Sequence, residues 1–422
     1  MGPIIIFDKS TLESLNPDEA MWLDHFFLSN ITPLFFIETL ADLEKKVRSG
    51  RSVEDIVGNL AYKTPDFSSK VNVYHRTLLE GELSGIGRLD LRNGRPHIDG
   101  GKRLELGGKT GVIFQPSPEE EAFSRWQNHE FLNLERLFAK AWRQDLSNIN
   151  LEESYKTFQS FFPISKPKNL TEVKKIVDFH INESNQGEVL QYGLSLLGAS
   201  PQFRAEILFR WQKLGKPLIK DFAPYFLHVF SIDLFFYIAI AADLIGRGRP
   251  SHKIDIAYLY YLPFCMIFTS NDNLHAEIAP FFMRENQTFF RGADLKLDLA
   301  KIDQHFSALP EEVKSGGVTS FAIYPPDDSS FLMARLWDKH MPKWRHNKMT
   351  HEPMPDRDSE ITKKIMEEIK DFKEKAVPVS GNSGSTKEAD HMLIERKVRM
   401  YKGKWMRFPP EVMEQSKDEK SA

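Results

Sequence analysis

Residues 3–12, PIIIFDKSTL, combine the pattern of a buried strand with an acidic residue at the point where the strand ends. The run IIIF is apolar at every position, which is typical of a parallel strand buried on both faces. Asp8 follows it directly. Asn16 and Pro17 then fit the N-cap and the first position of a helix. A strand followed so closely by a helix indicates an α/β fold.

Three further acidic residues occupy comparable positions. A second short strand, expected near residues 30–32, leads through Pro33 into an amphipathic helix that carries Glu38. Asp255 lies at the head of another helix, in the stretch KIDIAYLYYLPF. The apolar run after it, CMIFTSND, is expected to form a strand that ends at Asp272. Carboxylates at strand ends and in first helical turns can converge on one crevice, where a cation would offset their mutual repulsion.

This pattern resembles the PIN-domain family of metal-dependent nucleases. Asp8 matches the family's first acid, at the end of the first strand. Glu38 follows a Thr-Pro turn and begins a Glu-x-x-x-Asp-Leu pattern, like the second acid. Asp255 precedes the penultimate core strand, like the third, and Thr269-Ser270-Asn271-Asp272 is similar to the T-x-D element that supplies the fourth. The resemblance covers residues 1–45 and 220–295, and the long gap between the second and third acids departs from the family pattern.

The resemblance implies a Mg²⁺- or Mn²⁺-dependent nuclease in which all four acids bind the metal and activate the hydrolytic water. RNA is the expected substrate on the resemblance alone, because nothing in the residues distinguishes RNA from DNA. Two other functions stay open. One is a PIN-like module that binds RNA or a protein partner without cutting, and the other is a metal-dependent phosphohydrolase of a small molecule.

Each acid also has a purely structural explanation. Asp8 and Asp272 could cap the helices that follow them. Asp255 could complement the dipole of its helix from the first turn. Glu38 could be a surface residue that pairs within its own helix, where Asp42 lies one turn further on and could also serve as an auxiliary ligand.

Composition divides the chain into four segments. Residues 1–45 and 216–300 are expected to form the PIN-like core, a small parallel sheet flanked by helices. Residues 46–215 contain several helical patterns and one glycine-rich stretch, so we expect a mainly helical insertion there. This insertion could serve as a dimer interface or as a platform for a protein partner. Residues 301–422 are expected to be a C-terminal extension that ends in a basic and aromatic segment.

Two basic segments could hold nucleic acid. The C-terminal one interleaves cations with aromatic residues, which suits phosphate pairing and base stacking. The alternative is a terminal hairpin that packs its aromatic residues on the core. The other segment lies just before Asp255, where a positive rim could hold a polyanion beside the acids. The expected contact residues are Arg247, Arg249, Lys253, Arg399, Lys402, Lys404 and Trp405.

Length and composition narrow the class of protein. The chain has 422 residues, 41% of them hydrophobic, which is enough for a large core. Its net charge of −3 means that any basic surface must be local. A single cysteine, Cys265, cannot form an internal disulfide and favours the reducing cytoplasm. The most apolar stretch, PYFLHVFSIDLFFYIAIAADLIG, is interrupted by His228, Asp233 and Asp243, which predicts a buried core helix and no membrane span.

Two other motifs are too incomplete to carry a function. Gly108-Lys109-Thr110 is similar to the end of a phosphate-binding loop, but Arg103 stands where that loop needs its first glycine. The group His340, His346 and His351 has irregular spacing and cationic neighbours, which disfavours zinc.

Overall fold

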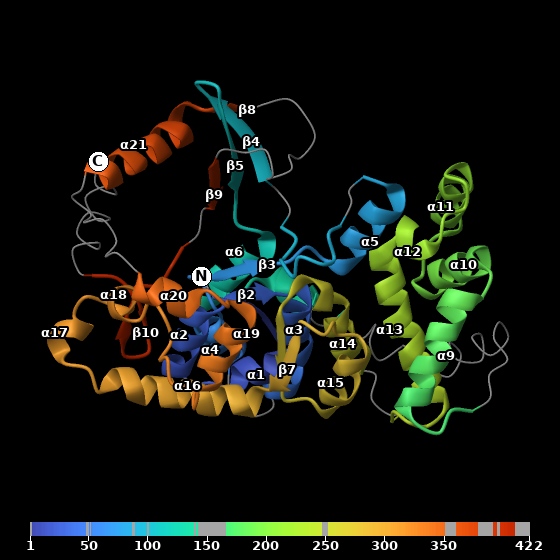
Figure 1. Ribbon diagram of the computed structural model, residues 1–422, viewed down its shortest axis with the longest axis horizontal. Helices are drawn as coiled ribbons and strands as arrows, with labels where there is room; N and C mark the ends of the chain where they lie inside the picture. Colours follow the sequence, from blue (N-terminus) through green and yellow to red (C-terminus); the bar gives the residue numbers. More distant parts are fainter. Residues whose placement is uncertain are drawn as a thin grey trace.

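The core of the protein is a five-stranded parallel sheet with helices on both faces, which confirms the α/β class (Figure 1). The computed structural model describes residues 2–47, 50, 52–86, 89–98, 101–138, 141, 166–246, 252–350, 360–378, 391–394 and 397–409. The strand order is β3-β2-β1-β6-β7, and every neighbouring pair is parallel. The strands are β1 (Ile4–Phe7), β2 (Leu28–Ile31), β3 (Ser69–Val71), β6 (Ile267–Ser270) and β7 (Thr288–Arg291).

The strand order reverses next to β1, the central strand. The chain runs from β1 to β2 and β3 on one side, and later adds β6 and β7 on the other side. In α/β folds, the crevice at the carboxyl ends of the two strands that flank such a switch is the usual place for a ligand. Asp8 follows β1 and Asn271 follows β6, so both lie at this edge of the sheet.

Alternate residues of β1 face two separate hydrophobic cores. Ile4 and Ile6 belong to one core, and Ile5 and Phe7 belong to the other. This division explains why the run has no polar position, since a strand buried on both faces has no solvated side. The first core is formed with α13 (Pro224–Ala241), α14 (His252–Ala257) and the 3-10 helix η1 (Tyr258–Phe264). The second core is formed with α2 (Pro17–Phe26), α4 (Val53–Lys63) and α16 (Gly292–Ser307).

The helix starts follow from local chemistry. Helix α1 (Lys9–Ser14) begins at Asp8, whose side chain accepts a hydrogen bond from the backbone of Thr11. Helix α2 has the expected N-cap at Asn16, completed as a capping box by Glu19. Helix α3 (Pro33–Val47) begins at proline, which lacks the N–H that a first helical turn leaves unused.

A lobe of helices lies at one end of the molecule, at the right of Figure 1. It contains α5 (His75–Ser84), α9 (Leu170–Glu183), α10 (Gln186–Leu196), α11 (Pro201–Lys213) and α12 (Ile219–Phe222), which surround α13. Among the described residues, α13 alone is long and apolar enough to cross a membrane, and 72% of it is buried inside the protein.

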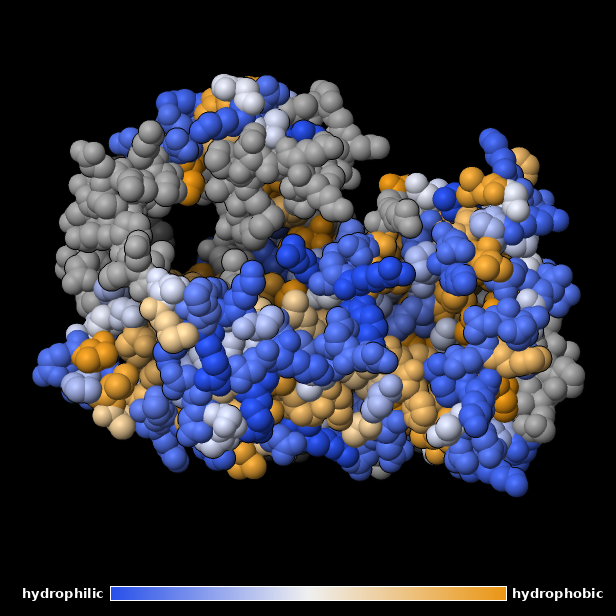
Figure 2. Space-filling model, in the orientation of Figure 1, coloured by the Kyte–Doolittle hydropathy of each residue, from blue (hydrophilic) through white to orange (hydrophobic). Residues whose placement is uncertain are grey.

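The surface of the helical lobe carries scattered apolar side chains. Figure 2 shows orange patches between hydrophilic ones over this end of the molecule. Phe179 of α9 and Phe209 of α11 are exposed there. A dimer or partner interface on this lobe stays a prediction.

The segment expected to be an insertion also contributes to the core. β3, from within residues 46–215, pairs with β2, and α4 packs on α6 (Pro118–Gln127) in the second core. The glycine-rich stretch forms the hairpin β4 (Gly101–Leu106) and β5 (Lys109–Phe114). This hairpin joins β8 (Val377–Pro378) and β9 (His391–Ile394) in a second sheet of order β8-β4-β5-β9, beside α21 (Glu360–Lys375) (Figure 1).

The remaining elements lie in the C-terminal half of the chain. Helix α15 (Asn273–Ile278) and the 3-10 helix η2 (Ala279–Phe281) connect β6 to β7. The elements after α16 are α17 (Glu311–Lys314), α18 (Val318–Phe321), α19 (Leu332–His340), α20 (Trp344–Met349), β10 (Tyr401–Lys402) and β11 (Trp405–Met406).

His75→Phe should reduce the sensitivity of the fold to acid. The His75 ring lies among the rings of Tyr74, Tyr260 and Tyr261, and no described residue forms a hydrogen bond with its Nδ1. Burial lowers the pKa of His75 to about 3. The side chain is therefore neutral in the fold but becomes protonated below about pH 6.5 in the unfolded chain, so stability is lost as the pH falls through that value.

Urea unfolding at pH 7 and pH 5 measures this effect. Between these pH values, the free energy of unfolding of the wild type should fall by about 2 kcal/mol more than that of His75→Phe. Parallel pH profiles for the two proteins would contradict the assignment of a buried neutral histidine.

Candidate active site at the carboxyl edge of the sheet

Asp8 lies at the carboxyl end of β1, where four donors fix its carboxylate. Oδ1 accepts hydrogen bonds from the backbone nitrogen of Thr11 at 2.9 Å and from its hydroxyl at 2.7 Å. Oδ2 accepts from the hydroxyls of Ser10 and Ser270, each at 2.7 Å. The residue is only 5% exposed. These four bonds satisfy a buried charge and hold it in one orientation.

Ser270, the last residue of β6, connects Asp8 to α15. Its hydroxyl accepts from the backbone nitrogen of Asp272 at 2.9 Å and lies 2.7 Å from Nδ1 of His275. Nε2 of His275 donates to the backbone carbonyl of Asp255 at 2.6 Å. A continuous path of hydrogen bonds therefore joins the ends of β1 and β6 to the backbone of α14.

Glu38 of α3 contacts both η1 and α1. Its Oε2 accepts from the hydroxyl of Tyr258 at 2.7 Å, and its Oε1 lies 3.4 Å from the ammonium of Lys9. Burial raises the pKa of Glu38 to about 7. Lys9 and Tyr258 oppose this rise, whereas the charges of Asp8 and Asp255 add to it. Glu38 therefore lies within electrostatic range of both Asp8 and Asp255. A shared metal site at these acids stays a prediction.

Lys9 is a cation inside this acidic group that the sequence analysis missed. Its side chain is 4% exposed and forms ion pairs with Glu38 and Asp42. Burial lowers the pKa of Lys9, but the charges of Glu38, Asp42 and Glu13 outweigh burial and raise it overall. The ammonium therefore stays charged. Its position directly after Asp8 was the only local signal of its role.

Asp255 and Asp272 lie around the end of β6. Asp255 is in the first turn of α14, with Oδ2 3.6 Å from Nδ1 of His252. Asp272 caps α15 by accepting from the backbone nitrogen of Leu274 at 2.6 Å. Asp272 therefore caps a helix, as Asp8 does. Both residues also lie at the carboxyl edge of the parallel sheet, after β1 and β6.

Lys253 forms its contacts with α13 and η1. Its ammonium donates to Asp233 of α13 at 2.5 Å and to the hydroxyl of Tyr260 at 3.2 Å. These bonds hold α14, and with it Asp255, against α13. The expectation that Lys253 contacts nucleic acid is inconsistent with this placement.

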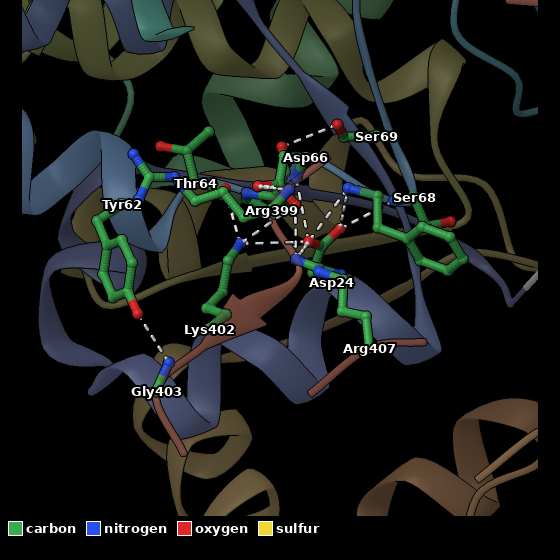
Figure 3. Close-up of polar contacts among 12 residues, drawn as sticks. Asp24, Tyr62, Thr64, Asp66, Ser68, Ser69, Arg399, Lys402, Gly403 and Arg407 are labelled. Atoms are coloured by element: carbon green, nitrogen blue, oxygen red, sulfur yellow. Dashed lines mark hydrogen bonds and ion pairs between the residues drawn. The ribbon is translucent and has the colours of Figure 1, made fainter. Parts of the chain in front are cut away.

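The basic C-terminal segment forms a hairpin on the core. Its strands β10 and β11 are antiparallel. Lys402 and Arg407 insert their cations between Asp24 of α2 and Asp66, and we call these four residues the buried ion cluster (Figure 3). Arg407 Nη2 lies 2.5 Å from both Asp24 Oδ2 and Asp66 Oδ1. Burial raises the pKa of Asp24, but the charges of Arg407 and Lys402 outweigh it and hold this pKa well below its usual range.

The other residues of this segment are also engaged by the core. Trp405 is 4% exposed and donates to Asp303 at 2.6 Å. Arg399 donates to the side-chain oxygen of Gln127 at 3.0 Å, and the half-exposed Lys404 pairs with Asp303.

Burial of Lys402 and Trp405 contradicts their expected role in nucleic-acid binding. The structure instead agrees with the alternative, a terminal hairpin packed on the core. Arg247 and Arg249 lie outside the described residues.

Asp8, Glu38, Asp255 and Asp272 offer hard carboxylate oxygens, the ligands that Mg²⁺ and Mn²⁺ prefer. Within the described part of the chain, no group of three or more His, Cys, Asp or Glu residues is arranged so that it could hold a metal ion. Comparison with protein-family models, with curated proteins and with solved structures gave no match.

Proposed function

We propose that this protein is a Mg²⁺- or Mn²⁺-dependent nuclease with a PIN-like core, and that it hydrolyses phosphodiester bonds of RNA. The observation that supports the proposal is that the charges of Asp8 and Asp255 both act on the buried Glu38, and that Asp8 lies where the strand order of the sheet reverses. These acids come from three separate elements. Buried carboxylates that repel one another are costly unless a cation offsets their charge.

Asp272 completes the proposed set, because its backbone bonds to Ser270, which in turn bonds to Asp8. A bound divalent cation supplies activation of the attacking water and neutralises charge that develops on the phosphate. The metal would be held by Asp8, Glu38, Asp255 and Asp272.

The surrounding residues orient these ligands. Thr11 and Ser270 fix both oxygens of Asp8, and Tyr258 fixes one oxygen of Glu38. Such supporting bonds determine how well a site is preorganised. Lys9 keeps part of the crevice neutral through Glu38 and Asp42.

A catalytically inactive binding module is the second candidate. The observation that favours it is Lys9, because its ammonium already pairs with Glu38, one of the carboxylates that a metal would need. The two candidates differ in one property, since only the nuclease needs the divalent cation.

The test is cleavage of labelled single-stranded RNA and DNA of matched sequence in Mg²⁺, in Mn²⁺ and in EDTA. The nuclease should cut RNA only with metal, and Asp255→Asn should lower the rate by about 10²- to 10³-fold, as removal of one group that stabilises a transition state does. Asp371→Asn is a matched control, because Asp371 is an exposed acid on α21 that pairs with Lys375.

The outcomes separate the candidates. No cleavage, together with a melting temperature that the metal leaves unchanged, would refute the nuclease and favour the binding module. Cleavage of DNA in preference to RNA would contradict the substrate that we propose while retaining the chemistry.

A further inference from the structure

A cavity of about 430 Å³ lies beside Asp272. Its volume falls in the range of roughly 300–1,000 Å³ that small-molecule sites occupy. Leu244 and Leu274 contribute apolar walls, and Asn273 and Glu277 contribute polar groups. Sites that bind flat, polar molecules combine these two kinds of lining.

The polar residues that line the cavity include His252, Asn271 and Asp272, and two more lie on α15. Asn273 and Glu277 are four residues apart and therefore neighbours on the helix surface. Asn273 Oδ1 accepts from Nη2 of Arg291 at 2.9 Å, which leaves the amide nitrogen to donate. The Glu277 carboxylate is exposed, and no described residue forms a hydrogen bond or an ion pair with it. The helix thus presents one donor beside a pair of acceptor oxygens.

This arrangement complements guanine among the nucleobases. The outer edge of guanine carries the acceptor O6 next to two N–H donors, at N1 and at the 2-amino group. A carboxylate can accept from both donors while an amide donates to O6. Uracil offers a single N–H between two acceptors. Adenine and cytosine each place an unprotonated ring nitrogen, which is an acceptor, where the carboxylate would lie. Each of these three bases therefore pairs less well with Glu277.

We propose that this cavity binds a guanine base, with Glu277 and Asn273 reading its edge and with Leu244 and Leu274 against its faces. The inference rests on the proposed function for its placement. Asp272, a proposed metal ligand, lines the cavity, so a base held there would bring its own phosphate to the acidic crevice. The enzyme would then cut RNA beside guanine.

The test measures nucleotide binding by calorimetry on the full chain in EDTA, where no metal-dependent cleavage occurs. GMP should bind more tightly than AMP, CMP and UMP, and IMP should bind more weakly than GMP because it lacks the 2-amino group. Glu277→Gln should weaken GMP binding roughly five- to hundredfold, the loss expected for one bidentate contact. Glu285→Gln, which changes an exposed acid outside the cavity, should leave GMP affinity unchanged.

Equal affinity for all nucleotides, or no binding of GMP at millimolar concentration, would overturn the inference. A single-stranded oligonucleotide with one guanine, compared with GMP, identifies the source of the base, because tighter binding of the oligonucleotide supports a polymer substrate. Guanine-selective binding by a chain that cuts nothing would keep the guanine site and refute the nuclease. Cleavage without base preference would support the nuclease and refute the guanine site.

Discussion

Asp8→Asn should lower the rate of metal-dependent RNA cleavage by about 10³-fold, at the upper end for loss of one stabilising group. The substitution removes the charge of a proposed ligand but preserves its size. The fold should survive, because the hydroxyls of Ser10 and Ser270 that face Oδ2 can rotate to accept from an amide. The loss should therefore reflect the chemistry and metal binding, with little loss of stability.

Two measurements check this expectation, the cleavage rate at saturating Mn²⁺ and the rise in melting temperature that Mn²⁺ produces. Thr11→Val is the matched control, since it removes one hydroxyl donor to Asp8 and keeps the carboxylate charge. Its effect should be smaller, about tenfold, as expected for a residue that supports a ligand. If the Asp8→Asn protein were fully active, Asp8 would not be a metal ligand and its role would be to cap α1.

Arg407→Met should destabilise the fold by about 3–5 kcal/mol, the usual loss when one partner is removed from a buried ion pair. Arg407 bonds to both Asp24 and Asp66, and its side chain is 1% exposed. Without it, two buried carboxylates would share the single charge of Lys402. An uncompensated buried charge costs more than the pair contributes when both partners are present.

Urea unfolding measures this loss. Lys404→Met is the matched control from the same hairpin, because Lys404 is 48% exposed and pairs with Asp303 near the surface. The control should change the free energy of unfolding by about 1 kcal/mol or less. An equally small change in Arg407→Met would mean that water or a shift of Lys402 satisfies the two acids.

Local patterns were sufficient to predict the framework of the core. The run before Asp8 gave the central strand, and Asn16 with Pro17 gave the start of α2. The apolar run before Asp272 gave β6. In each case the prediction depends on a few neighbouring residues, because burial requires an apolar run and capping requires particular residues at the helix start.

Features that depend on distant partners were not predictable. β3 is only three residues long and two of them, Ser69 and Lys70, are polar, so its place in the sheet comes from pairing with β2. Lys402 and Trp405 have the local pattern of a nucleic-acid contact. Their actual partners, such as Asp24, lie hundreds of residues away, and no short stretch of sequence contains both.

The buried ion cluster also determines when the core can be completed during protein synthesis. Asp24 and Arg407 are 383 residues apart in the chain. At a synthesis rate of roughly 5–20 residues per second, about 20–75 s separate the appearance of Asp24 from that of Arg407. During that interval the Asp24 carboxylate of helix α2 has no ion pair with Lys402 or Arg407, because neither residue has been synthesised. The nascent protein would therefore complete its core only when the hairpin of β10 and β11 leaves the ribosome. A chain released before Arg407 is made would lack one of the two cations that neutralise Asp24.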